Sequence, residues 1–188
     1  GYNVLERAVM LAPDNKELMS RVADLYASGD RPKEAAEYMA SVVRLYAVEG
    51  NHEKAFEIAQ KGLKLDRYNY PLRQYVFDSA LVNGKKEDAV TSARYLVSFF
   101  QENQKLEEAG VTCRRIIEAD PENIEFRQKL VDLCVELGDM DKAMSECEAL
   151  EQIVPADSLD LIKTYRRVSR RFPGKSRSPR LPPPSRRS

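Results

Sequence analysis

The chain has 188 residues, of which 32% are charged and 43% are hydrophobic, an ordinary composition for a water-soluble protein. No run of about 18 apolar residues occurs in it, which excludes a membrane-spanning helix. The formal net charge is zero, but residues 1–162 hold 20 basic against 30 acidic residues, net −10, and the remaining residues hold ten basic residues and no acidic one. This asymmetry is typical of chains that contact charged partners.

Glycine, proline and asparagine divide the chain into segments with helical apolar spacing. The first segment looks like the second helix of a repeat, so we expect the chain to start inside a longer protein. No segment has the pattern of a strand, and we therefore expect an all-α fold of about ten helices. The predicted helices cover residues 3–11, 16–28, 32–48, 52–65, 70–82, 86–101, 105–119, 124–137, the segment between Asp139 and Pro155, and 158–171.

Residues 90–123 and 124–157 share one layout of helix, turn, helix and closing proline. The matching positions are Leu96 with Leu130, Ala109 with Ala143, and Pro121 with Pro155. The layout resembles the tetratricopeptide repeat (TPR) family, whose 34-residue pattern has a small alanine where two helices cross closely. The departures are Ala93 and Arg127 at the aromatic position, Val97 and Val131 at the glycine, and Cys113 and Cys147 at the phenylalanine.

The resemblance implies a right-handed α-solenoid of antiparallel helix pairs over residues 1–171. Residues 172–188 form a basic tail rich in proline, arginine and serine, which we expect to be disordered because it lacks core-forming residues. A cloning or frame-shift origin of this tail is an open alternative.

A second period of 54 residues is also visible, with three helices in each block. It superposes Asn15, Asn69 and Asn123, and also Ala35, Ala89 and Ala143. Strict alternation of inner and outer helices from residue 16 would make residues 52–65 an inner helix, although their pattern is that of an outer one. Either the middle of the chain departs from TPR packing or one assignment is wrong.

Several polar residues are candidates for a binding groove, because the resemblance implies that inner helices line a concave surface. Gln74 and Asp78, and likewise Gln128 and Asp132, are four residues apart and share a helix face away from the core. A solvated face repeated by duplication is the alternative. The complete candidate set is Asp24, Gln74, Asp78, Gln128, Asp132 and Glu136. The TPR subtype that clamps a terminal carboxylate is discounted, because it uses lysine and asparagine where this chain has Gln and Asp, or Arg94 and Ser98.

The end of the last predicted helix carries a basic patch of Arg166, Arg167, Arg170 and Arg171. Spaced in this way, the four side chains can share one side and suit phosphates or an acidic protein surface. The alternative, which we favour, is a solvated helix end whose cations complement the helix dipole.

We expect no catalytic residue, no metal site and no cofactor. The single His52 begins a helix without a partner nucleophile, and the three cysteines occupy core positions. The predicted function is a non-enzymatic protein–protein interaction scaffold that binds a cationic or neutral protein or peptide in the groove. Nucleic-acid or acidic-surface binding through the basic C-terminal segment is the alternative, and the acidic repeat body argues against nucleic acid. The free thiols and the absence of a signal peptide indicate a cytoplasmic location.

Overall fold

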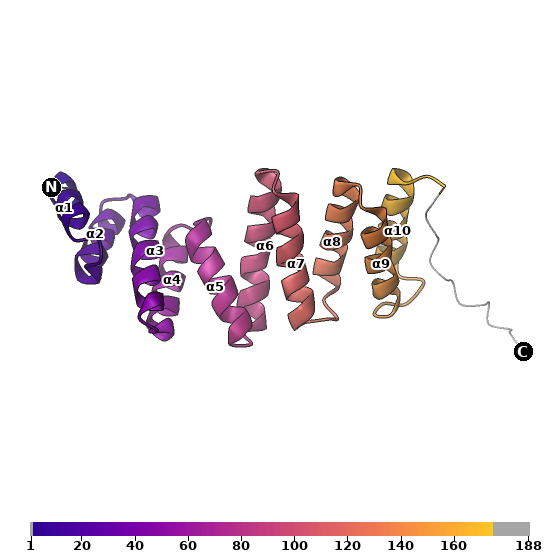
Figure 1. Ribbon diagram of the computed structural model, residues 1–188, viewed down its shortest axis with the longest axis horizontal. Helices are drawn as coiled ribbons and strands as arrows, with labels where there is room; N and C mark the ends of the chain where they lie inside the picture. Colours follow the sequence, from indigo (N-terminus) through magenta and orange to yellow (C-terminus); the bar gives the residue numbers. More distant parts are fainter. Residues whose placement is uncertain (1, 175–188) are drawn as a thin grey trace, which may run out of the picture. The chain divides into compact units, whose positions relative to one another are not determined.

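The computed structural model describes residues 2–174, and within them the chain forms ten α-helices and no strand (Figure 1). The helices are α1 (Tyr2–Leu11), α2 (Lys16–Ser28), α3 (Pro32–Val48), α4 (His52–Leu65), α5 (Tyr70–Val82), α6 (Lys86–Glu102), α7 (Leu106–Ala119), α8 (Ile124–Leu137), α9 (Met140–Glu151) and α10 (Leu159–Arg171). Their bounds agree with the predicted ones to within one residue, except that α9 ends at Glu151, three residues before the predicted end, and the all-α expectation is confirmed.

The helix ends repeat every 54 residues because the same capping chemistry recurs. Asn15, Asn69 and Asn123 each accept a hydrogen bond from the backbone N–H three residues later, at 2.9, 3.2 and 3.1 Å, which satisfies a donor that the first helical turn leaves open. The backbone is left-handed at Asp30, Gly84 and Gly138, with φ of 56°, 66° and 76°. These three residues are also 54 positions apart, so each block turns into its second helix in the same way.

The chain divides into two compact units, Gly1–Leu96 and Val97–Ser188, with the division inside α6. In the first unit, α3 packs against α2, α4 and α5. One core of this unit joins Ala36 and Val43 of α3 to Ala55 and Ala59 of α4 and Leu72 of α5. Alanines at the crossings let the helix backbones approach closely, as the repeat pattern predicts.

The second unit follows the same principle. Its α8 packs against α7, α9 and α10, and α10 also packs against α9. The side chains of Phe126, Leu130, Cys147, Leu161 and Val168 are each at most 2% exposed and form its interior. The predicted crossing alanines Ala109 and Ala143 are fully buried here, as Ala55 and Ala89 are in the first unit.

Alternation of the helices holds in the first unit. Because α3 contacts α5 directly, and Lys61 of α4 reaches Asp24 of α2 at 3.4 Å, α2 and α4 lie on one side and α3 and α5 on the other. The helix of residues 52–65 therefore alternates normally, despite its outer-helix pattern. The 54-residue shift relates α2 to α5, which are three helices apart. Because successive helices alternate, α2 and α5 lie on different sides of the first unit.

No helix within residues 2–174 is both long and apolar enough to cross a membrane. Most of the predicted tail, from residue 175 onward, lies outside the part of the chain that the structure describes.

Candidate binding site between α8 and α10

The three aspartates of the predicted groove each contact a partner within the chain. Asp78 accepts a hydrogen bond from Gln74 at 2.9 Å, and both side chains are half-buried. Asp24 is exposed and pairs with Lys61, and Asp132 pairs with Arg167 at 2.9 Å. Asp24 and Asp78 belong to α2 and α5, which lie on different sides of the first unit.

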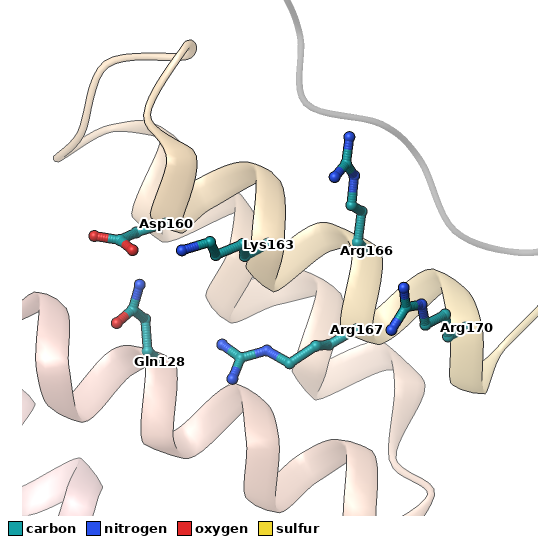
Figure 2. Close-up of a pocket in the computed structure, with 6 residues that line it drawn as sticks. All are labelled: Gln128, Asp160, Lys163, Arg166, Arg167 and Arg170. Carbon is teal, nitrogen blue, oxygen red and sulfur yellow. The ribbon is translucent and has the colours of Figure 1, made fainter.

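In the second unit, two sequence-predicted surfaces meet. Gln128 of α8, from the candidate groove, borders a pocket of about 440 Å³ together with Arg166, Arg167 and Arg170 of α10, from the basic patch. Asp160 and Lys163 of α10 complete its lining. We call this pocket the α8–α10 cleft. Figure 2 shows Asp160 and Lys163 across from Gln128, Arg167 reaching toward α8, and Arg166 projecting away from it.

The position of the cations follows from the way α10 packs. Leu161, Thr164, Tyr165 and Val168 of this helix are buried, so they fix which face is turned inward. The Tyr165 hydroxyl also donates a hydrogen bond to Glu151 of α9 at 2.7 Å, and burial is the largest cause that raises the pKa of Tyr165. The four basic residues, Lys163, Arg166, Arg167 and Arg170, recur at i, i+3, i+4 and i+7 and therefore form a stripe along the opposite, solvent-facing side.

The electrostatics of the α8–α10 cleft are positive. Four cations line it against one carboxylate, that of Asp160. Within residues 2–174, Lys163, Arg166 and Arg170 form no ion pair, whereas Arg167 is held by Asp132 and donates to the Thr164 hydroxyl at 3.3 Å. Partial burial raises the pKa of Asp132, and the positive charges of Arg167 and Lys129 oppose that rise. The cleft is thus suited to a carboxylate or another anion.

Sequence reasoning missed Lys163 and Asp160 as cleft residues. Lys163 is three residues before Arg166 and seven before Arg170, and this helical spacing is the signal that adds it to the stripe. Arg171 is exposed, but it is not among the residues that line the cleft. Glu136 is exposed on α8 and also lies outside it.

No group of acidic, histidine and cysteine residues suited to a metal ion occurs in the part of the chain that the structure describes. Cys113, Cys134 and Cys147 are free and buried, and burial raises the pKa of Cys113 and Cys147 to about 12. His52 is exposed, with its ring Nδ1 3.5 Å from the Tyr75 hydroxyl.

Comparison with known proteins gives one family match. A family model described as tetratricopeptide repeat matches residues 100–159. A search of curated proteins found no match.

Several solved structures match this chain in the course of the backbone, although their sequences have low identity to it. The MamA RS-1 ArsTM double mutant is 17% identical, with 80% of this chain and 90% of that chain covered and a TM-score of 0.37. The P58(IPK) TPR domain is 16% identical, with 89% and 58% covered and a TM-score of 0.34. YrrB, described as a TPR protein with an unusual peptide-binding site, is 13% identical, with 93% and 95% covered and a TM-score of 0.34.

The family match covers α7, α8 and α9, which contain Ala109 and Ala143 of the repeat pattern, and the segment after α9, which contains Pro155. Residues 100–159 therefore match the tetratricopeptide repeat family, and the repeat pattern is found in this part of the chain.

Proposed function

We propose that the chain is a non-enzymatic protein-interaction module that binds an acidic peptide segment in the α8–α10 cleft. The observation that carries this proposal is the meeting of Gln128, a predicted groove residue, with four cations of α10 in one pocket. Repeat proteins of this kind bury a continuous core and use the remaining helix faces for binding. An open pocket with three cations that form no ion pair within residues 2–174 suits a ligand that brings carboxylates.

This proposal changes the expected charge of the ligand. The net charge of −10 over residues 1–162 favours cationic or neutral ligands. However, a cation that lines the pocket lies within a few ångströms of a bound ligand and attracts it strongly. Exposed charges more than about 10 Å from the ligand are largely screened at 0.1 M salt. The cations of α10 therefore decide the local preference. Gln74 and Asp78 remain candidates for neutral or cationic ligands in the first unit.

The test uses the full chain and a fluorescein-labelled peptide with four consecutive glutamates, followed by fluorescence anisotropy. Replacing Lys163 or Arg170 by glutamine should weaken binding at least threefold, in keeping with loss of about 0.7 kcal/mol or more per cation. Arg171→Gln is the matched control, because Arg171 is adjacent, equally charged and outside the lining; it should change affinity less than twofold.

Two results would contradict the proposal. Equal effects of Arg170→Gln and Arg171→Gln would show that net charge, and not the α8–α10 cleft, binds the peptide. Tighter binding of a single-stranded oligonucleotide, weakened by the same variants, would favour nucleic acid as the ligand. A peptide with glutamine in place of each glutamate should bind weakly, and added salt should reduce binding of the glutamate peptide.

A further inference from the structure

Two arginines 54 residues apart have the same local geometry. Arg73 is the fourth residue of α5, and Arg127 is the fourth residue of α8. The Nε–H of Arg73 donates to the carbonyl oxygen of Arg67 at 2.8 Å, and that of Arg127 donates to the carbonyl oxygen of Pro121 at 3.0 Å. Each acceptor lies six residues earlier, so the backbone holds the two guanidinium groups in equivalent positions.

The two arginines differ in what faces them. In the second unit, Arg127 pairs with Glu146 of α9 at 2.8 Å, and these side chains are only 14% and 23% exposed. The residue 54 positions before Glu146 is Ser92 of α6. Ser92 is 1% exposed, and its hydroxyl has no hydrogen-bond partner within residues 2–174. The carboxylate that satisfies Arg127 thus has no counterpart at the earlier position.

Arg73 is half-buried and forms no ion pair in the part of the chain that the structure describes. Its guanidinium lies over the Tyr95 ring, 4.0 Å from the centroid, and burial lowers the pKa of Arg73. Burying the Arg73 guanidinium and the Ser92 hydroxyl costs free energy, because both groups have lost hydrogen bonds to water. A negatively charged acceptor that binds beside them would accept hydrogen bonds from both groups and offset this cost.

Space for such an acceptor is present. A pocket of about 280 Å³ is lined by Arg73 and Ser92 together with Gln60 and Lys64 of α4 and Asp88 and Thr91 of α6. Lys64 is exposed and likewise forms no ion pair within residues 2–174. Two cations against one carboxylate leave the lining positive. Asp88 opposes a doubly charged group more than a singly charged one, which favours a carboxylate over a phosphate.

We propose that this pocket binds the carboxylate of an acidic side chain from a protein partner, in the place that Glu146 takes in the later repeat. Arg73 donates N–H groups to the ligand, and the Ser92 hydroxyl donates its proton to a carboxylate oxygen. Lys64 adds a charge at the rim. This site is separate from the α8–α10 cleft and stands whether or not that cleft binds a peptide.

The first experiment fills the pocket from within. Ser92→Glu should form with Arg73 the ion pair that Glu146 forms with Arg127, and Ser92→Gln, of the same size without charge, is the control. We expect the Tm of Ser92→Glu to exceed that of Ser92→Gln by about 2–4 °C, the shift that corresponds to about 1 kcal/mol in a domain of this size. The difference should vanish in the background Arg73→Met, which carries the residue found at the equivalent position, Met19, of the first block.

The second experiment measures binding through the NMR signal of the Arg73 Nε–H. Titrating acetate against chloride at constant ionic strength should give a saturable shift with a Kd on the order of 1–10 mM, the range expected for one small anion. The peptide acetyl-Ala-Glu-Ala-amide should give the same shift, and its glutamine counterpart should give none. In Ser92→Glu the shift with acetate should be lost, because the internal carboxylate occupies the site.

Three results would overturn the proposal. One is an equal Tm for Ser92→Glu and Ser92→Gln, and another is an acetate shift that persists unchanged in Ser92→Glu. The third is saturation by inorganic phosphate at concentrations about tenfold below those of acetate, a preference of about 1.4 kcal/mol that would assign the pocket to phosphate groups.

Discussion

The guanidinium of Arg167 on α10 lies 2.9 Å from the carboxylate of Asp132 on α8, which ties the last helix to the helix on which it packs. The two side chains are 46% and 36% exposed, so water screens their attraction. A double-mutant cycle with Asp132→Asn and Arg167→Gln should therefore give a coupling energy of about 0.2–1 kcal/mol in urea unfolding.

The pair of Arg21 and Glu17 on α2 is the control for this cycle. Its atoms are 3.9 Å apart and its side chains are 76% and 84% exposed, so its coupling should be smaller. A coupling between Asp132 and Arg167 no larger than that of the control would show that the pair does not hold α10 in place.

The crossing of α8 and α9 depends on a small residue at position 143. Ala143 is fully buried. Protein interiors are close-packed, so the three additional carbon atoms of leucine would have no free space at this position. Ala143→Leu should destabilise the chain by about 1–3 kcal/mol in urea unfolding. Glu148→Leu, at an exposed position of α9, should change stability by no more than about 0.5 kcal/mol. Equal effects of the two variants would contradict the assignment of a close crossing.

Replacing glycine by alanine should affect stability differently at two helical positions, Gly62 and Gly110. A Cβ at Gly62 of α4 would lie 2.5 Å from Cδ1 of the buried Leu72, whereas one at Gly110 of α7 would find its nearest side-chain atom at 3.5 Å. Gly110→Ala should stabilise the chain by about 0.5–1 kcal/mol, the helix propensity of alanine over glycine. Gly62→Ala should lose that gain to overpacking and be neutral or destabilising. Chemical denaturation compares them, and equal stabilisation would show that Leu72 moves aside freely.

The ten helices were predictable because their signals are local. An asparagine that caps a helix contacts a backbone N–H three residues away, and a left-handed turn needs one residue that tolerates it. The buried alanines at positions 109 and 143 followed from the repeat pattern for the same reason.

The candidate sites were less accessible from sequence, because they depend on contacts between distant residues. Arg167 and Asp132 are 35 positions apart, and the sequence places them on two separate surfaces rather than in one. The 54-residue shift aligns Ser92 with Glu146, but this difference gains meaning only when Glu146 is seen to contact Arg127. The 54-residue period relates α2 to α5, but only the contacts between helices show that these two lie on different sides of the first unit.

Acid should weaken the cap of α9 through Asp139. This side chain accepts the Lys142 N–H at 3.1 Å and pairs with the Lys142 ammonium at 2.7 Å. The side-chain hydrogen bond from Lys142, and then the backbone one, lower the pKa of Asp139 below its ordinary value of 3.8. A lowered pKa in the folded state stabilises the fold above the ordinary value, and this stabilisation is lost as pH falls through the folded pKa.

Asp139→Asn tests this effect, because asparagine caps a helix about as well as aspartate but does not titrate. The Tm of the parent chain should fall relative to that of the variant as pH decreases from about 5 to about 2, while other carboxylates titrate equally in both. Parallel curves of Tm against pH would contradict a role for the Asp139 charge.

The three thiols should be unreactive in the folded chain. Cys113 and Cys147 are fully buried, Cys134 is 4% exposed, and burial raises the pKa of Cys113 and Cys147 to about 12, so almost no thiolate exists at neutral pH. In the unfolded chain their pKa returns to about 8.5 and all three become accessible. Labelling with a disulfide reagent at pH 8 should therefore be at least about 100-fold slower in native buffer than in urea, because it requires opening of the core. Cys134, the least shielded, should react first, and Cys134→Ala should remove this first phase. Rapid reaction of two or three thiols in native buffer would show that the packing of α7, α8 and α9 is looser than this structure.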